Sequence, residues 1–128
     1  MLGSEELVAF VSTTNADRAR VFYRDVLGLS LISEDAFALR FDCRGTTLRI
    51  SIAPEVTPAK YTVLGWAVKD IRASLAALAS AGVKFERFDF FKQDELGVWT
   101  APNGDQVAWF KDPEGNLLSI AQTSTYTT

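Results

Sequence analysis

The chain has 128 residues, of which 48% are hydrophobic and 23% charged, and its formal net charge is −3. This composition can bury a core within one domain. The two signs of charge are interspersed, which excludes the basic stripe typical of nucleic-acid binding, and no apolar run approaches the ~20 residues that span a bilayer. We therefore expect neither nucleic acid nor a membrane as a partner.

The first six residues and the cysteine content indicate a cellular location. Residues 1–6 are acidic where a secretory signal would be basic, which favours a cytoplasmic protein. Cys43 is the single cysteine, so it forms no internal disulfide, and the chain has no histidine to activate its thiol. We interpret Cys43 as a half-buried filler and not as a nucleophile.

The first half of the chain predicts one strand, one helix and three further strands. Val8–Asn15 is an apolar run that ends in a residue able to cap a helix. Apolar residues then recur at helical spacing from Ala16 to Leu27, and Gly28 supplies a helix stop. Strand-like runs follow at residues 29–33, 37–42 and 46–53.

The second half repeats this order, which predicts a second module of the same β-α-β-β-β kind. Its apolar run at 63–70 also ends in a capping residue, and a helical pattern from Ile71 to Ala79 is closed by Gly82. The strand-like runs that follow are 83–88, 98–101, 106–111 and 116–122. We expect a single domain over 1–128, with modules at about 5–53 and 61–123 and a linker at about 54–60.

Two segments of the chain resemble the signature segments of the vicinal oxygen chelate superfamily, which contains glyoxalases, bleomycin-resistance proteins and extradiol dioxygenases. They are Phe22–Leu29 in the first half and Phe110–Leu118 in the second. The resemblance implies an α+β fold in which two βαβββ modules form a curled mixed β-sheet cup with helices on the outside. It also implies a pocket for a small-molecule ligand inside the cup, and a homodimer.

In the metal-dependent members of this superfamily, each module supplies one metal ligand from its first strand and one from its last. By the resemblance, these four positions fall on Val8, Arg49, Val63 and Ser119. Valine has no lone pair to donate, arginine is a permanent cation, and a lone serine hydroxyl is a poor ligand. We therefore expect no metal site of the family type and no cofactor. The carboxylates at 34–35, 89 and 94–95 are interpreted as solvated charges in turns and loops.

Strand alternation predicts which residues line the cup. The expected lining residues are Val8, Phe10, Ser12, Thr47, Arg49, Ser51, Val63, Gly65 and Ala67. Arg49 would place a positive charge where the family places a metal, which suits a carboxylate or phosphate on a ligand. Two alternatives remain open, since Arg49 would face away after a register slip, or would pair with an acid such as Asp42.

The tryptophans have two interpretations. Trp66 is expected in the core, whereas Trp99 and Trp109 either fill the core or stack on a flat ligand at the edge of the cup. The loop at 90–97 is a candidate lid. Its Phe90 and Phe91 would alternatively pack against a second subunit.

The leading functional hypothesis is a metal-free small-molecule binding protein that sequesters a drug or metabolite, as the resistance members of the superfamily do. The candidate ligand-binding residues are Arg49, Phe10, Ser12, Val8, Val63, Ser119, Trp99 and Trp109. The alternative is a lyase, isomerase or dioxygenase of the same superfamily, with displaced metal ligands or with catalysis by a carboxylate. Net acidity suits a cationic ligand, whereas Arg49 suits an anionic one, and the sequence leaves this conflict open.

Overall fold

The computed structural model describes residues 1–123, so the last residues of the predicted domain, 124–128, lie outside the described residues. The chain divides into two compact units, one formed by Met1–Pro58 and one that begins at Ala59. The division falls inside the segment predicted as a linker. None of the helices within residues 1–123 has the length and the apolar character that crossing a bilayer requires.

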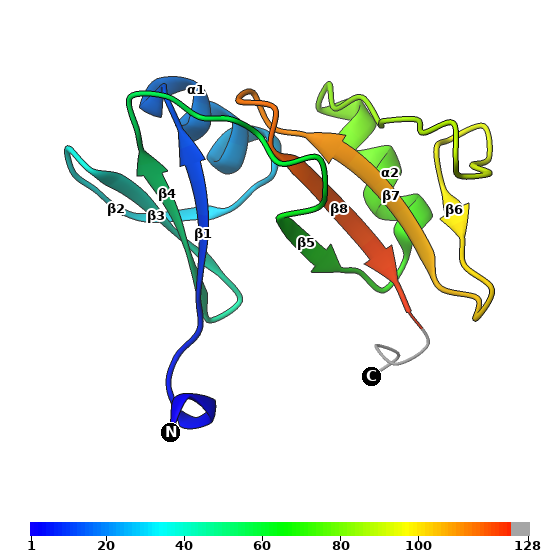
Figure 1. Cartoon of the computed structure of the whole chain (residues 1–128), viewed down its shortest axis with the longest axis horizontal. Helices are drawn as coiled ribbons and strands as arrows, with labels where there is room; N and C mark the ends of the chain where they lie inside the picture. Colours follow the sequence, from blue (N-terminus) through cyan, green and yellow to red (C-terminus); the bar gives the residue numbers. More distant parts are fainter. Residues whose placement is uncertain (124–128) are drawn as a thin grey trace. The chain divides into compact units, whose positions relative to one another are not determined.

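The first unit is a four-stranded mixed sheet with two consecutive helical segments (Figure 1). The strand order is β1-β4-β3-β2, with β1 parallel to β4 and the other neighbours antiparallel. Its elements are η1 (Leu2–Ser4), β1 (Val8–Thr13), α1 (Ala16–Arg20), η2 (Val21–Val26), β2 (Ser30–Glu34), β3 (Ala38–Cys43) and β4 (Thr46–Ile52). The predicted β-α-β-β-β order of the first module is confirmed.

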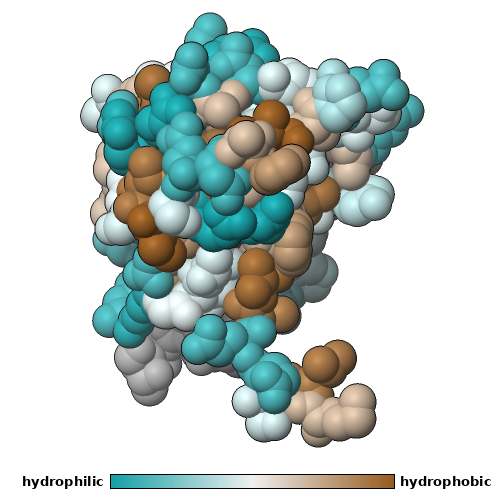
Figure 2. All heavy atoms as spheres, turned by 90° about the vertical axis from the view of Figure 1, so that its left-hand side faces the viewer, coloured by the Kyte–Doolittle hydropathy of each residue, from teal (hydrophilic) through white to brown (hydrophobic). Residues whose placement is uncertain are grey.

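One face of this sheet forms the core of the first unit. The rings of Tyr23 in η2 and Phe41 in β3 lie 6.0 Å apart, which joins the helical segment to the sheet. The other buried apolar strand residues on this face are Val11, Leu39, Leu48 and Ile50. On the side that carries β2 and β3, the outer surface is mixed. Separate apolar groups are interspersed among hydrophilic ones (Figure 2). The apolar residues of the unit therefore gather mainly between the sheet and its helices.

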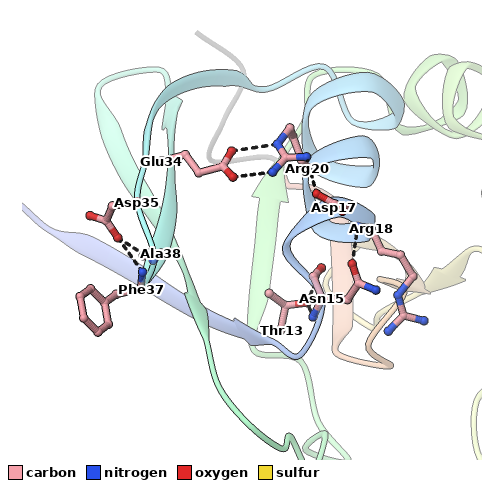
Figure 3. Close-up of polar contacts among 9 residues, drawn as sticks. All are labelled: Thr13, Asn15, Asp17, Arg18, Arg20, Glu34, Asp35, Phe37 and Ala38. Atoms are coloured by element: carbon pink, nitrogen blue, oxygen red, sulfur yellow. Dashed lines mark hydrogen bonds and ion pairs between the residues drawn. The ribbon is translucent and has the colours of Figure 1, made fainter.

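The helical segment of the first unit begins as predicted but changes its winding. Asn15 caps α1, since its side chain accepts the backbone N–H of Arg18 at 3.0 Å (Figure 3). The chain then continues as the π-helix η2, in which the Leu27 N–H donates to the carbonyl of Phe22. Gly28 follows with a φ of 78°, the left-handed conformation expected of a helix stop.

The second unit has the same organisation (Figure 1). Its strand order is β5-β8-β7-β6, again with the first and last strands parallel. The Asp70 side chain caps its helix by accepting the Ala73 N–H at 3.1 Å. The elements are β5 (Leu64–Ala67), α2 (Ile71–Ser80), β6 (Trp99–Thr100), β7 (Gln106–Lys111) and β8 (Leu117–Gln122). The chain therefore carries two βαβββ modules built on mixed sheets, as predicted.

One predicted strand of the second unit is wrong. Residues 83–88 form no strand, and within them only Phe85 makes an isolated bridge, to Phe110. The strand predicted at 98–101 is reduced to the two residues of β6. The chain between α2 and β6 is instead an irregular loop.

Gln93 gives the physical reason for this loop. Its side-chain oxygen accepts the backbone N–H of Phe88 at 2.8 Å. Its side-chain nitrogen donates to the carbonyls of Glu86 and Gly97 at 2.9 and 2.7 Å. Because one carboxamide satisfies three backbone groups that a strand would offer to a neighbour, these groups are not paired in a sheet.

Candidate functional site

The first sheet has one face that is not covered by α1 and η2, and we call it the open face of unit 1. Strand register places on it Val8, Phe10 and Ser12 of β1, Ala38, Arg40 and Asp42 of β3, and Thr47, Arg49 and Ser51 of β4. Phe10 is 63% exposed and Val8 is 41% exposed, whereas Val11 on the opposite face is 5% exposed. The alternation expected from the sequence is present on β1 and β4.

Arg49 lies on this open face, and no acidic side chain within residues 1–123 pairs with it. Its Nε donates to Ser51 Oγ at 3.3 Å, and within residues 1–123 its guanidinium takes part in no ion pair. Asp42, the acid considered as its partner, accepts the Gly45 N–H at 3.1 Å and lies opposite Thr47. The terminal nitrogens of Arg49 therefore remain available as donors.

Arg40 is a residue of this face that the sequence analysis missed. It lies directly opposite Arg49 in the antiparallel register of β3 and β4. Its Nη1 donates to Asp35 Oδ2 at 3.0 Å. The position of Arg40 opposite Arg49 depends on the pairing register of two adjacent strands. Local sequence patterns do not reveal this register.

Asp35 holds the turn that leads into β3. Its Oδ1 accepts the backbone N–H groups of Phe37 and Ala38 at 2.8 and 3.0 Å (Figure 3). The pKa of Asp35 lies below its ordinary value, first because of the Phe37 N–H, then because of Arg40, then because of the Ala38 N–H. The carboxylate thus orders the turn and anchors the Arg40 guanidinium at the same time.

In the second unit, the equivalent face carries Ser119 between Gly65 and Trp109, its direct neighbours on β5 and β7. A Cβ on residue 65 would lie 2.7 Å from Ser119 Oγ, so the glycine makes room for the serine hydroxyl. That hydroxyl has no hydrogen-bond partner in the part of the chain that the structure describes. Val63 lies just before β5, where its N–H donates to the Leu117 carbonyl at 3.0 Å.

An aromatic cluster covers the β6 and β7 side of this face of the second unit, and it comprises Phe88, Phe90, Phe91, Trp99 and Trp109. The ring of Phe91 stacks on Trp109 at a centroid distance of 5.0 Å and an interplanar angle of 5°, and it lies 4.6 Å from Trp99. Trp109 is only 8% exposed, and its Nε1 donates to Thr62 Oγ1 at 3.2 Å. Trp99 and Trp109, for which the sequence left stacking on a ligand open, therefore contact the protein's own loop.

The loop that carries these phenylalanines is held by Asp94. Its Oδ1 accepts the N–H groups of Leu96 and Val98, each at 2.9 Å, and its Oδ2 accepts from Arg72 of α2 at 2.9 Å. Partial burial alone would raise the pKa of Asp94, but the Val98 N–H, Arg72 and the Leu96 N–H outweigh it and lower that pKa. Asp94 is thus a structural group of the loop, and not merely a solvated charge.

The second signature segment is also structural. Asp112 Oδ1 accepts the N–H groups of Glu114 and Asn116 at 2.9 Å, and the Asn116 side chain donates to Asp112 Oδ2 at 2.9 Å. Asp112 and Asn116 are both buried. Their mutual hydrogen bonds fix the turn between β7 and β8, which sets the position of Ser119 on β8.

The side chains present do not fit a metal of the family type. The donor set at the four positions is two valines, one arginine and one serine, which lacks the His, Cys or carboxylate groups that divalent metals need. Within residues 1–123, no three His, Cys, Asp or Glu side chains lie close enough to hold a metal ion together.

Three of the acids interpreted as solvated charges, Glu34, Asp35 and Asp94, are engaged in ion pairs and turns. Arg20 donates to both carboxylate oxygens of Glu34 (Figure 3), and chiefly these hydrogen bonds lower the pKa of Glu34. Asp35 and Asp94 are engaged in the same way, as described above. A carboxylate with a lowered pKa is a weaker proton acceptor, so this pairing disfavours a general-base role for these three acids.

Comparison with known proteins gives one family and a set of structures. A family profile described as "Glyoxalase/Bleomycin resistance protein/Dioxygenase superfamily" matches residues 7–120. Among curated protein sequences, none matches the chain.

Solved structures with a similar fold include the following three. TnmS3, an antibiotic binding protein from a Streptomyces species, is 23% identical over 94% of this chain and 97% of its own, with a TM-score of 0.74. A lactoylglutathione lyase from Agrobacterium tumefaciens is 18% identical over 98% of both chains, with a TM-score of 0.74. A member of the same superfamily from Sphaerobacter thermophilus is 19% identical over 94% and 98%, with a TM-score of 0.72. At these identities the similarity establishes the fold alone.

Proposed function

Because the chain belongs to the glyoxalase/bleomycin resistance protein/dioxygenase superfamily, we propose that it is a metal-free member that binds a small molecule, a drug or a metabolite, without changing it. One observation carries the proposal. The family resemblance implies a metal ligand on β4 at the position of Arg49. This residue is a half-buried cation, and its described hydrogen bond uses one of its five N–H donors. A permanent cation repels a metal ion and attracts an anionic or polar ligand group.

The proposed ligand contacts lie on the open face of unit 1 and on the equivalent face of unit 2, beside the aromatic cluster. In unit 1 they are Val8, Phe10, Ser12 and Arg49, and in unit 2 they are Val63, Ser119, Trp99 and Trp109. An exposed apolar ring beside a guanidinium offers both contact area and orientation to a ligand. In unit 2, the Ser119 hydroxyl, which has no hydrogen-bond partner among residues 1–123, offers a hydrogen bond at the position opposite Trp109 in the strand register.

The fold is compatible with both binding and catalysis. An antibiotic binding protein and a lactoylglutathione lyase both have it. The choice between the two classes for this chain therefore rests on its own side chains. The donor set at the family's metal positions supports binding, and the engaged carboxylates give no support to a carboxylate-based enzyme.

The proposal extends to the assembly. We expect the two units to act as a single domain over 1–128 in a cytoplasmic homodimer. Phe90 is 77% exposed at the edge of the aromatic cluster and is the side chain best suited to a contact between two chains. Sedimentation equilibrium of the wild-type protein and of Phe90→Ser tests this expectation, because only a dimer that uses Phe90 would become monomeric in the variant.

Elemental analysis tests the proposed function directly. Protein purified without added metal, and again after dialysis against each metal with excess removed, is analysed for zinc, nickel, iron and manganese. The proposal predicts far less than one metal ion per chain in both preparations, and ligand binding that survives treatment with a chelator. Stoichiometric metal that is required for binding or for turnover would overturn it.

A further inference from the structure

Two arginines oppose each other on the open face of unit 1. Arg40 and Arg49 are direct partners in the antiparallel pairing of β3 with β4. In such a pair the Cβ atoms are about 4.5–5.5 Å apart, and like charges placed there destabilise the sheet. An anion that contacted both guanidinium groups would remove this repulsion.

Only one of the two charges is compensated. Arg40 is paired with Asp35 at 3.0 Å, whereas Arg49 forms no ion pair within residues 1–123. Each guanidinium has five N–H donors, and the described contacts use one on each side chain. The pair therefore offers a net positive charge and several donors to an incoming group.

The surroundings of Arg49 define what kind of anion fits. In the parallel pairing of β1 with β4, Arg49 lies directly opposite Phe10, whose side chain is 63% exposed. Arg49 itself is half-buried, and partial exclusion of water strengthens its attraction for a negative charge. One row across the sheet thus presents the Phe10 ring, the Arg49 guanidinium, which has no ion pair within residues 1–123, and the Arg40 guanidinium, which is anchored by Asp35.

We infer that Arg40 and Arg49 bind the carboxylate of a small aromatic acid whose ring lies against Phe10. This inference rests on the proposed function and names the class of ligand for the same face. A planar carboxylate matches the planar donor pattern of a guanidinium, so Arg49 can hold it with two parallel hydrogen bonds. The conflict between an acidic chain and a cationic Arg49 is thereby resolved in favour of an anionic ligand.

Calorimetric titration with two matched probes tests the inference. The probes are 2-naphthoate and the uncharged 2-naphthamide, both measured with a chelator present. We expect naphthoate to bind at least about tenfold more tightly than the amide, and Arg49→Ala and Arg40→Ala each to lose about tenfold or more for naphthoate alone. Phe10→Ala should weaken both probes by a similar factor.

Two further variants serve as controls. Arg44→Asn removes a positive charge from the exposed turn between β3 and β4, where φ is 49°, a conformation that asparagine tolerates, and it should leave naphthoate affinity within about twofold. Arg49→Lys keeps the charge but loses the planar donor fork, so its affinity should fall between those of the wild type and Arg49→Ala. The lysine variant keeps the test informative even if the alanine variant folds poorly.

The outcomes separate this inference from the proposed function. Equal affinity for both probes, or naphthoate affinity unaffected by Arg49→Ala, overturns the carboxylate site and leaves metal-free binding standing. Absence of naphthoate binding at millimolar concentration also overturns it, as does a change of oligomeric state in Arg49→Ala without a change in affinity, which would mean that a second copy covers the face. Binding of either probe only after metal is added overturns the proposed function instead.

Discussion

The two βαβββ modules of this chain differ in how the sheet face away from the helices is used. In unit 1 the face carries an exposed Phe10 and the opposed pair Arg40 and Arg49. In unit 2 the β6 and β7 side of the corresponding face is covered by the aromatic cluster, in which Phe91 stacks on Trp109. The first face thus exposes an aromatic ring beside two opposed arginines, whereas the second is covered in part by side chains of its own loop.

The difference arises in the segment that follows each helix. In unit 1 this segment is β2, which pairs with β3 through one register shift between Leu31 and Ser33 and leaves the face uncovered. In unit 2 the Gln93 side chain binds backbone groups that a strand would use, and the resulting loop brings Phe88 and Phe91 against Trp109. The side chains of Gln93 and Asp94 thus hold a loop in unit 2 where unit 1 has a strand.

Replacing one aromatic residue on each face should give the largest difference in unfolding free energy between the two units. Trp109→Ala removes a buried ring with three aromatic neighbours and should cost about 3–5 kcal/mol of unfolding free energy. Phe10→Ala removes a ring that is 63% exposed and should cost less than about 1 kcal/mol. Urea unfolding measures both, and comparable losses would contradict the contrast between a filled and an open face.

Replacing Gln93 is a second test of the difference between the two units. Gln93→Ala leaves one N–H and two carbonyls of the loop without their partner, which should cost about 1–3 kcal/mol. Hydrogen exchange at residues 86–98 should accelerate while exchange in β1 and β4 stays unchanged. Lys92→Ala, at an exposed position in the same loop, is the matched control and should leave both regions as they are.

The smallest expected effect is the pH dependence of the stability that the Asp94 carboxylate gives to its loop. Because the pKa of Asp94 is lowered in the folded chain, its contribution to stability is present above the unfolded value of about 3.9 and is lost as the pH falls through the folded pKa. Asp94→Asn should therefore lower the urea midpoint at pH 7, and the gap from wild type should shrink below about pH 4. Asp89→Asn, at an exposed acid of the same loop, should change the midpoint little. A gap that stays constant with pH would show that the charge of Asp94 does not hold the loop.

Most of the fold could be predicted because its signals are local. Asn15 and Asp70 cap their helices, Gly28 and Gly82 have positive φ, and the paired modules follow from apolar periodicity. The strand expected at 83–88 failed because the side chain of Gln93, from further along the chain, competes for its backbone groups. Apolar alternation alone does not reveal such competition.

The candidate site was predictable only in part. The face of Arg49 follows from strand alternation, but its neighbour Arg40 depends on the register between β3 and β4. The sequence left Trp99 and Trp109 open between core and ligand contact, because their environment depends on a loop without regular structure. Interactions between strands and loops of distant sequence position therefore account for most of what the sequence did not reveal.

The central claim is that the open face of unit 1 binds a small molecule without a metal. Two-dimensional NMR of the isotope-labelled protein, titrated with 2-naphthoate in the presence of a chelator, tests it most directly. We predict saturable shifts at the amides of Phe10, Arg40 and Arg49, with the amides of α2 unchanged. Shifts that require added metal, or that are confined to unit 2 while β1 and β4 stay unperturbed, would contradict the claim.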